Sequence, residues 1–259
     1  MEKAIDYKHL YALQDKVLAV VFALENSFYL TGGTALHRFH YNARYSDDLD
    51  LFTSSDDLFG ESINEILDEL EGKFRLKHSV KSRDFHRVIV DDSLQLDFVN
   101  DSVYRFGKSD IIDGIRVDNK INILANKVTA IIGRDESKDV FDLFCIAAHE
   151  EFSWKDILSI ASRKAVVEKE VLIERLSNFP LNWLDNLKTI EQFEITRQML
   201  KQICNDILLS QIKEYFFIIK DTVYTDKIIH TIEIEVKNYA KVDRLLSEYQ
   251  SQGKLKFNC

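Results

Sequence analysis

Cysteine and proline are both scarce in this chain of 259 residues, which contains three cysteines and one proline. The cysteines, Cys145, Cys204 and Cys259, lie far apart and match neither the spacing of a metal site nor a disulfide framework. Their number and spacing argue against a disulfide-rich secreted fold and favour a reducing compartment.

Long apolar runs are also missing, and no segment approaches the length that crosses a membrane. The N-terminal residues Met1–Asp6 do not show the charged-then-apolar order of a signal peptide. We therefore expect a cytoplasmic protein without a membrane partner.

An excess of positive charge is the third absence. The chain has 34 Lys and Arg residues against 43 Asp and Glu residues, which gives a net charge of −9. This balance argues against a broad electrostatic grip on nucleic acid. An RNA substrate would have to meet a confined cationic surface.

The remaining composition is that of a globular protein, with 46% hydrophobic and 30% charged residues. Helical periodicity predicts helices over 6–26 and 61–72, and β-rich runs predict strands at 85–90 and 94–99. Beyond Ala148 the pattern is mostly helical. We expect a two-domain α/β (α+β) protein with a mixed sheet and helices in residues 1–116 and a mainly helical part in 117–259. Further predicted elements near the C-terminus are two strand-like runs at 216–219 and 232–236 and a helix at 239–249.

The first motif follows an apolar run, Phe28–Leu30, that is typical of a buried strand. Gly32 and Gly33 allow a tight turn and a close approach to the backbone. Thr34 is then placed to cap a helix that begins at Ala35. Free N–H groups at such a helix start favour an anion.

The second motif holds Asp48 and Asp50, which bracket Leu49 and precede Leu51. In a strand, residues two apart face the same side, so the two carboxylates would project together while the leucines enter the core. Neighbouring carboxylates repel each other unless a cation lies between them, and Mg²⁺ prefers such oxygen ligands together with phosphate oxygens. The alternative is a satisfied salt bridge. Asp47 has the opposite parity and is interpreted as structural or solvent-facing.

Together these motifs resemble the nucleotidyltransferase family of abortive-infection toxins, the AbiEii/AbiGii group of type IV toxin–antitoxin systems. That family lies within the DNA polymerase β-like nucleotidyltransferase superfamily. The residues that carry the resemblance are Gly32-Gly33-Thr34-Ala35-Leu36 and Arg44-x-Ser46-x-Asp48-Leu49-Asp50-Leu51-Phe52.

The resemblance implies roles for further residues. Arg44 and Ser46 match the family pattern; Ser46 can tie down the loop, and Arg44 can steady the carboxylates or contact phosphate. In polymerase β-like enzymes a third carboxylate comes from a strand beside the first pair. Asp97, a lone acid in the apolar strand that follows the predicted turn 91–93, fits that role; the alternative is an acid at a strand edge.

A third cluster lies near the middle of the chain. Lys127 and Arg134 are seven residues apart and lie near one line of a predicted helix, and Asp139 and Asp142 share a face at the start of the next helix. The residues alone leave a solvated charged face and a functional cluster equally open. The resemblance implies that Lys127 contacts the triphosphate and that Asp139 lies in the active site, whereas Asp142 holds the two helices together.

The implied activity is Mg²⁺-dependent transfer of a nucleoside monophosphate from a nucleoside triphosphate to an acceptor hydroxyl, with release of pyrophosphate. By resemblance, the acceptor is the 3′ end of a tRNA and a cognate antitoxin protein is a partner. The alternatives are a transferase that modifies a small molecule, such as an antibiotic, and a non-catalytic nucleotide-binding module.

Overall fold

The structure is a computed structural model that describes residues 5–24, 26–54, 59–190 and 195–210. The chain divides into two compact units. The first comprises Met1–Ile123 with Lys188–Gln192, and the second comprises Leu124–Leu187 with Phe193–Cys259. Each unit is described by itself.

A seven-stranded mixed sheet forms the centre of the first unit, in the order β3-β4-β5-β2-β1-β7-β6. Strand β2 pairs antiparallel with β1 and parallel with β5, while β1 and β7 are also parallel. The strands are β1 (Tyr29–Thr31), β2 (Leu49–Thr53), β3 (Leu76–Lys81), β4 (Phe85–Val90), β5 (Leu94–Asn100), β6 (Asp110–Ile112) and β7 (Ile115–Val117).

Alternation along the central strands gives this sheet one apolar face. Leu49 and Leu51 of β2 are fully buried and stand in register with Leu96 and Phe98 of β5, which are fully buried as well. Because side chains alternate between the two faces of a strand, Asp50 projects to the opposite face. The core of this unit therefore places the acids of β2 and β5 on the other side of the sheet.

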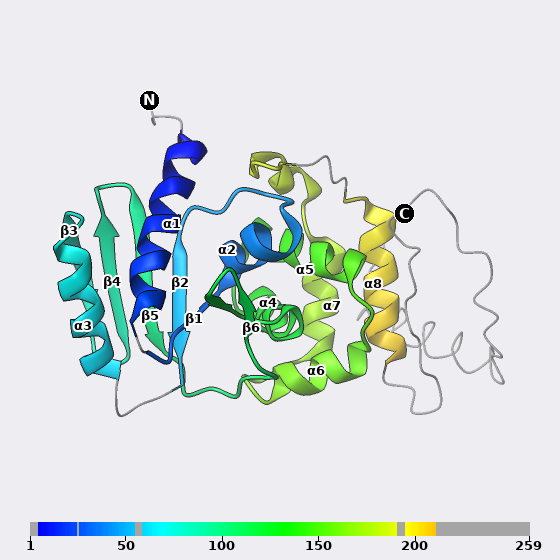
Figure 1. The fold of residues 1–259 in the computed structure, drawn as a ribbon. Coiled ribbons are helices and arrows are strands. Elements are labelled where there is room, and N and C mark those ends of the chain that lie inside the picture. Colours follow the sequence, from blue (N-terminus) through cyan, green and yellow to red (C-terminus); the bar gives the residue numbers. More distant parts are fainter. Residues whose placement is uncertain (1–4, 25, 55–58, 191–194, 211–259) are drawn as a thin grey trace, which may run out of the picture. The chain divides into compact units, whose positions relative to one another are not determined.

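Helices cover the apolar face. Helix α1 (Tyr7–Ala23) packs against α3 (Phe59–Glu71), and both lie on the same side of the sheet (Figure 1). The ring of Phe59 lies 5.9 Å from that of Phe28, at the start of the β1 segment. Between β1 and β2 the chain forms α2 (Gly32–Leu36), which continues into the π-helical turn η1 (His37–Tyr41).

The described elements of the second unit are helical. Helix α4 begins in the first unit and continues into the second. Helix α8 packs against α7, and α5 is buried along most of its length. The elements are α4 (Lys120–Gly133), α5 (Ser137–His149), α6 (Trp154–Ser162), α7 (Lys169–Asn178), η3 (Leu181–Asn186) and α8 (Arg197–Leu209).

The predicted α/β class is confirmed, and the predicted first helix and sheet strands form close to their expected bounds. The first compact unit extends to Ile123, and β7 belongs to its sheet because it pairs with β1 through Leu30 and Val117. The elements predicted beyond Ser210 lie outside the described residues. No helix in the described ranges combines the length and apolar character needed to cross a membrane.

Candidate active site

The glycine turn after β1 makes room for two side chains of the following loop and strand. Gly32 has a φ of +71°, and a Cβ atom at this position would collide with Oδ2 of Asp50. A Cβ at Gly33 would lie 2.6 Å from Nη2 of Arg44 and 2.9 Å from Oγ of Ser46. The two glycines therefore bring Asp50, Arg44 and Ser46 directly against the backbone of the turn.

The predicted cap at Thr34 is wrong. The helix begins at Gly32, so Thr34 lies inside it and is fully buried. Its hydroxyl bonds to Oγ of Ser46 at 2.9 Å and to the main-chain carbonyl of Asp48. The glycine backbone follows the helical turn earlier than the sequence pattern indicated, and Thr34 ties that turn to the loop that carries Asp48.

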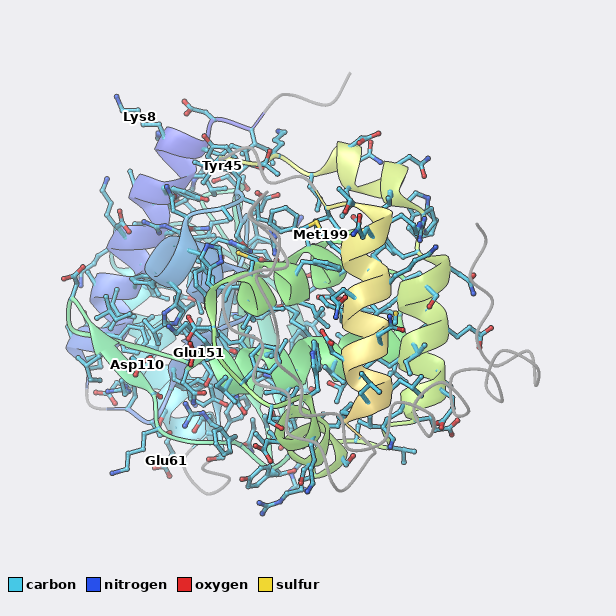
Figure 2. All side chains as sticks on the ribbon, turned by 90° about the vertical axis from the view of Figure 1, so that its right-hand side faces the viewer. Lys8, Tyr45, Glu61, Asp110, Glu151 and Met199 are labelled. Carbon is cyan, nitrogen blue, oxygen red and sulfur yellow. The ribbon has the colours of Figure 1, made fainter. Side chains whose placement is uncertain are left out.

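Helix α1 holds the same loop from another direction. The amide of Ser46 donates to the hydroxyl of Tyr11 at 3.2 Å, and Nε2 of Gln14 donates to the carbonyl of Ser46 at 3.2 Å. The ring of Tyr45 stacks on that of Tyr7 at 4.0 Å, and Figure 2 shows Tyr45 near the end of α1 where Lys8 lies. Ser46 therefore has the loop-holding role that the sequence predicted, with its side chain buried in the process.

Asp48 and Asp50 lie at the start of β2, on the sheet face opposite the apolar core. Asp48 immediately precedes the strand and Asp50 is its second residue; both are half-buried. Asp47 is exposed, as predicted from its parity. The turn at Gly32 thus contacts the strand at the position of Asp50.

Asp97 occupies the adjacent position on β5. The parallel register pairs Asp50 with Asp97, so the two side chains point to the same face. Asp97 is only 5% exposed. The strand predicted beside the first carboxylates is present, and the role of Asp97 in the chemistry stays a prediction.

The guanidinium of Arg87, a residue that the sequence patterns did not single out, forms an ion pair with Asp97. Nε of Arg87 donates to Oδ1 of Asp97 at 2.7 Å and Nη2 donates to Oδ2 at 2.6 Å, while Nε2 of Gln95 reaches Oδ2 at 3.2 Å. The sequence contained the signal, because the predicted turn at 91–93 pairs Val90 with Leu94 and hence Arg87 with Asp97.

The charges of all three acids affect the pKa of Arg87. Its hydrogen bonds to Asp97 raise the pKa of Arg87 above its ordinary value, against the lowering effect of burial. The negative charges of Asp97, Asp50 and Asp48 act in the same upward direction. The guanidinium therefore lies within the field of the whole carboxylate group.

The carboxylates of Asp48, Asp50 and Asp97 are the candidate ligands for a divalent cation at this site. Among the described residues, no three acidic, histidine or cysteine side chains converge in a way that could hold a metal ion. Asp48 and Asp50 offer the half-buried carboxylate oxygens that Mg²⁺ prefers, and Oδ2 of Asp50 lies directly against the backbone of Gly32. Both oxygens of Asp97 already accept hydrogen bonds. Asp48 and Asp50 are therefore the candidate ligands, whereas Asp97 is held by Arg87 and would have to exchange that partner to join them.

The cluster predicted in the middle of the chain is a buried ion-pair network in the second unit. Nζ of Lys127 lies 2.8 Å from Oδ1 of Asp139 and 2.6 Å from Oδ2 of Asp142, and Nε of Arg134 lies 2.7 Å from Oδ2 of Asp139. Burial alone would raise the pKa of Asp139, but Lys127 and Arg134 outweigh it and hold that pKa below its ordinary value. The pair Lys127–Asp142 links α4 to α5, as predicted for Asp142.

A second network lies beside the glycine turn and was also missed. The buried carboxylate of Asp118, just before α4, accepts from Oγ1 of Thr31 at 2.8 Å and from Nη2 of Arg105 at 2.9 Å. Oδ1 of Asn119 caps the helix, accepting from the amide of Asn122 at 2.9 Å. Asp118 and Arg105 thereby hold the residue that precedes Gly32.

A family model described as "Nucleotidyl transferase AbiEii toxin, Type IV TA system" matches residues 16–217, which is more than half of the chain. The chain belongs to the AbiEii family. The matched range contains the glycine turn, the three acids of the sheet and the Lys127 network, so every candidate site residue falls within the AbiEii match.

Individual relatives of this AbiEii chain are distant. An uncharacterised protein of Aquifex aeolicus is 29% identical over 147 residues, which cover 54% of this chain and 66% of that protein. The match thus spans just under two thirds of the length of that curated relative.

Solved structures from Helicobacter pylori resemble this chain. A candidate nucleotidyltransferase from Helicobacter pylori aligns with a TM-score of 0.51 at 17% identity, covering 81% of this chain and 95% of that chain. JHP933, also from Helicobacter pylori, aligns with a TM-score of 0.47 at 16% identity, covering 71% and 80%. The first likeness shows that the AbiEii chain has the fold of that candidate nucleotidyltransferase.

Proposed function

We propose that this protein transfers a nucleoside monophosphate from a nucleoside triphosphate to an acceptor hydroxyl and releases pyrophosphate. One observation carries the proposal: Asp50 and Asp97 stand in register on neighbouring strands, with Asp48 two residues away and the Gly32 backbone against Asp50. Membership in a family described as nucleotidyl transferases supports it.

In this proposal Asp48 and Asp50 hold Mg²⁺, and Asp97 is either a third ligand or the base that accepts the proton of the acceptor hydroxyl. The bound cation supplies positive charge that offsets the phosphate charge during transfer. Asp97 suits the role of base because its position beside Asp50 puts it on the same face of the sheet. The acceptor oxygen then forms the new bond to the α-phosphorus as the bond to pyrophosphate breaks.

The glycine turn and its supports position the triphosphate. The backbone of Gly33 and Thr34 presents amide groups, and Arg44 lies against Gly33 with its guanidinium. Ser46 fixes the turn to the following loop through its hydrogen bond with Thr34. We further propose that Lys127 neutralises negative charge on the triphosphate and that Asp139, whose Oδ1 lies 2.8 Å from the Nζ of Lys127, orients this lysine.

The acceptor in this proposal is the 3′ end of a tRNA, and the protein is the toxin of a toxin–antitoxin pair. The support is the family description, which names a toxin of a type IV system and therefore implies an antitoxin partner. Modifying the tRNA end would block translation and arrest growth.

The acceptor is tested by incubating the protein with Mg²⁺, each α-labelled nucleoside triphosphate in turn, and total tRNA. The same reactions are run with a panel of hydroxyl-bearing small molecules, including aminoglycosides. Label that migrates with tRNA supports the proposed acceptor, whereas label on a small molecule would replace it with the alternative transferase.

The matched pair of variants is Asp50→Asn in β2 and Asp47→Asn, an exposed acid in the loop just before that strand. Both changes remove one negative charge, but only the first affects the proposed site. If nucleotide binds and no acceptor is labelled under any condition, the protein is a nucleotide-binding module instead.

A further inference from the structure

The carboxylate of Asp97, a candidate metal ligand, is already paired with other side chains of the sheet. Its two oxygens accept three hydrogen bonds, two from Arg87 at 2.7 and 2.6 Å and one from Gln95 at 3.2 Å. Only 7% of the Asp97 side chain is exposed. A carboxylate this buried needs a charged partner, because leaving it unpaired is costly.

The position of Arg87 is fixed by the strands rather than by chance contact. Arg87 of β4 stands directly opposite Asp97 in the antiparallel register, and Asp50 stands beside Asp97 on the other side. The three residues therefore form one row across β4, β5 and β2 on the face opposite the apolar core.

The side chain of Arg87, unlike that of Asp97, is partly exposed to solvent. Its side chain is 34% exposed, and its guanidinium lies 5.4 Å from the ring of Phe85, two residues earlier on the same strand. It can move without opening the core. Gln95, on the same strand face as Asp97, would keep one hydrogen bond to the carboxylate when Arg87 leaves.

We propose that Arg87 is an internal counter-cation for Asp97 that competes with a divalent ion and must release this carboxylate before the ion can bind it together with Asp48 and Asp50. Arg87 is thus a positioning residue that acts through Asp97. It lowers the affinity for a free metal ion, so that the full site assembles only when other charges, such as a triphosphate, can accept the guanidinium. This inference rests on the metal-dependent transfer proposed above.

The test is Mn²⁺ binding without nucleotide, followed by the electron paramagnetic resonance signal of free Mn²⁺. Arg87→Met should bind Mn²⁺ more tightly than the wild type by about five-fold or more. The matched control is Arg83→Met, which removes an arginine that is 90% exposed in the neighbouring turn, and its affinity should equal that of the wild type.

The same substitution in an Asp97→Asn variant shows whether Arg87 affects Mn²⁺ binding through Asp97. In Asp97→Asn protein the additional change Arg87→Met should give no gain, because there is no carboxylate left to release. Equal Mn²⁺ affinities of the wild type and Arg87→Met would overturn the inference. So would the same gain in Arg83→Met, or a gain that persists without Asp97, since either would reflect net charge alone.

If Arg87→Met does not fold by circular dichroism, Arg87→Lys replaces it. Lysine keeps the charge but loses the paired bond, and it should still bind Mn²⁺ more tightly than the wild type; unchanged affinity overturns the inference. A wild type that transfers nucleotide while the affinities stay equal would sink this inference alone. The predicted affinities without any transfer would sink the proposed function alone.

Discussion

Gly32 is the residue on which the geometry of the site depends most. Its φ of +71° is one that side chains rarely adopt, and its missing Cβ leaves the space that Oδ2 of Asp50 fills. Any side chain here would both strain the backbone and push Asp50 out of its row with Asp97.

We therefore expect Gly32→Ala to lower the free energy of unfolding by about 1–3 kcal/mol and to abolish transfer. Gly114→Ala is the matched control, because Gly114 also has a positive φ, +81°, but has open space around it. It should lose only the backbone contribution, about 1 kcal/mol, and keep its activity. Urea denaturation and the labelled-nucleotide assay measure the two effects; equal activities in both variants would refute the role of the Gly32–Asp50 contact.

Asp206 of α8 gives the protein a dependence on pH at the residue scale. Burial raises its pKa from 3.8 to about 7, and Oδ2 has no hydrogen-bond partner within the part of the chain that the structure describes. Because the folded pKa is raised, the folded state keeps a proton that the unfolded state loses between these values. Stability therefore falls as the pH rises through this window and levels off above it.

Asp206→Asn should remove this dependence. We expect the variant to melt above the wild type at pH 8 and to match it near pH 4, with a difference of up to about 4 kcal/mol at the upper end. Asp185→Asn, an exposed acid of η3 in the same unit, should melt like the wild type at both pH values. Parallel melting curves of Asp206→Asn and the wild type across pH 4–8 would contradict the assignment.

At the scale of elements, the network of Lys127, Asp139 and Asp142 joins α4 to α5. Both carboxylates are fully buried, and Lys127 contacts each of them. Breaking a buried ion pair from one side leaves its partners in a low-dielectric environment without that compensation.

Lys127→Met should therefore destabilise the fold by about 3–5 kcal/mol, measured by chemical denaturation. The exposed Lys155→Met on α6 should change stability by less than about 0.5 kcal/mol. A stable Lys127→Met protein would show that the network is not structural, and a loss of transfer in that stable variant would then support the role proposed for Lys127. Activity measurements on this lysine need the stability measurement beside them.

The elements also show how far the sequence alone could lead. The hairpin turn at 91–93 and the alternation in β5 were readable, and counting back from the turn would have paired Arg87 with Asp97. The sequence pattern placed the start of α2 too late because glycine has a low helix propensity. Glycine is required at position 32 because Asp50 of the neighbouring strand lies against the backbone there. The buried partners of Asp118 come from residues up to 87 positions away, which no local pattern encodes.

At the scale of the whole molecule, the bounds of the first unit depend on two pairings between distant segments. Strand β7 joins the sheet through a pairing of Leu30 with Val117, and a bridge between Arg44 and Thr189 returns a short late segment to the first unit. Both pairings are long-range and leave no periodic signature. The carboxylates of β2 and β5, by contrast, were recognisable because lone acids stand out in apolar strands.

We propose that this AbiEii-family protein transfers a nucleoside monophosphate with the help of the carboxylates at the start of β2. The most direct measurement compares α-labelled with γ-labelled nucleoside triphosphate in the presence of tRNA, for the wild type and Asp50→Asn. We expect that only the α label enters the acceptor, that the γ label is released as pyrophosphate, and that Asp50→Asn transfers neither. Entry of the γ label into the acceptor, or undiminished transfer by folded Asp50→Asn, would contradict it.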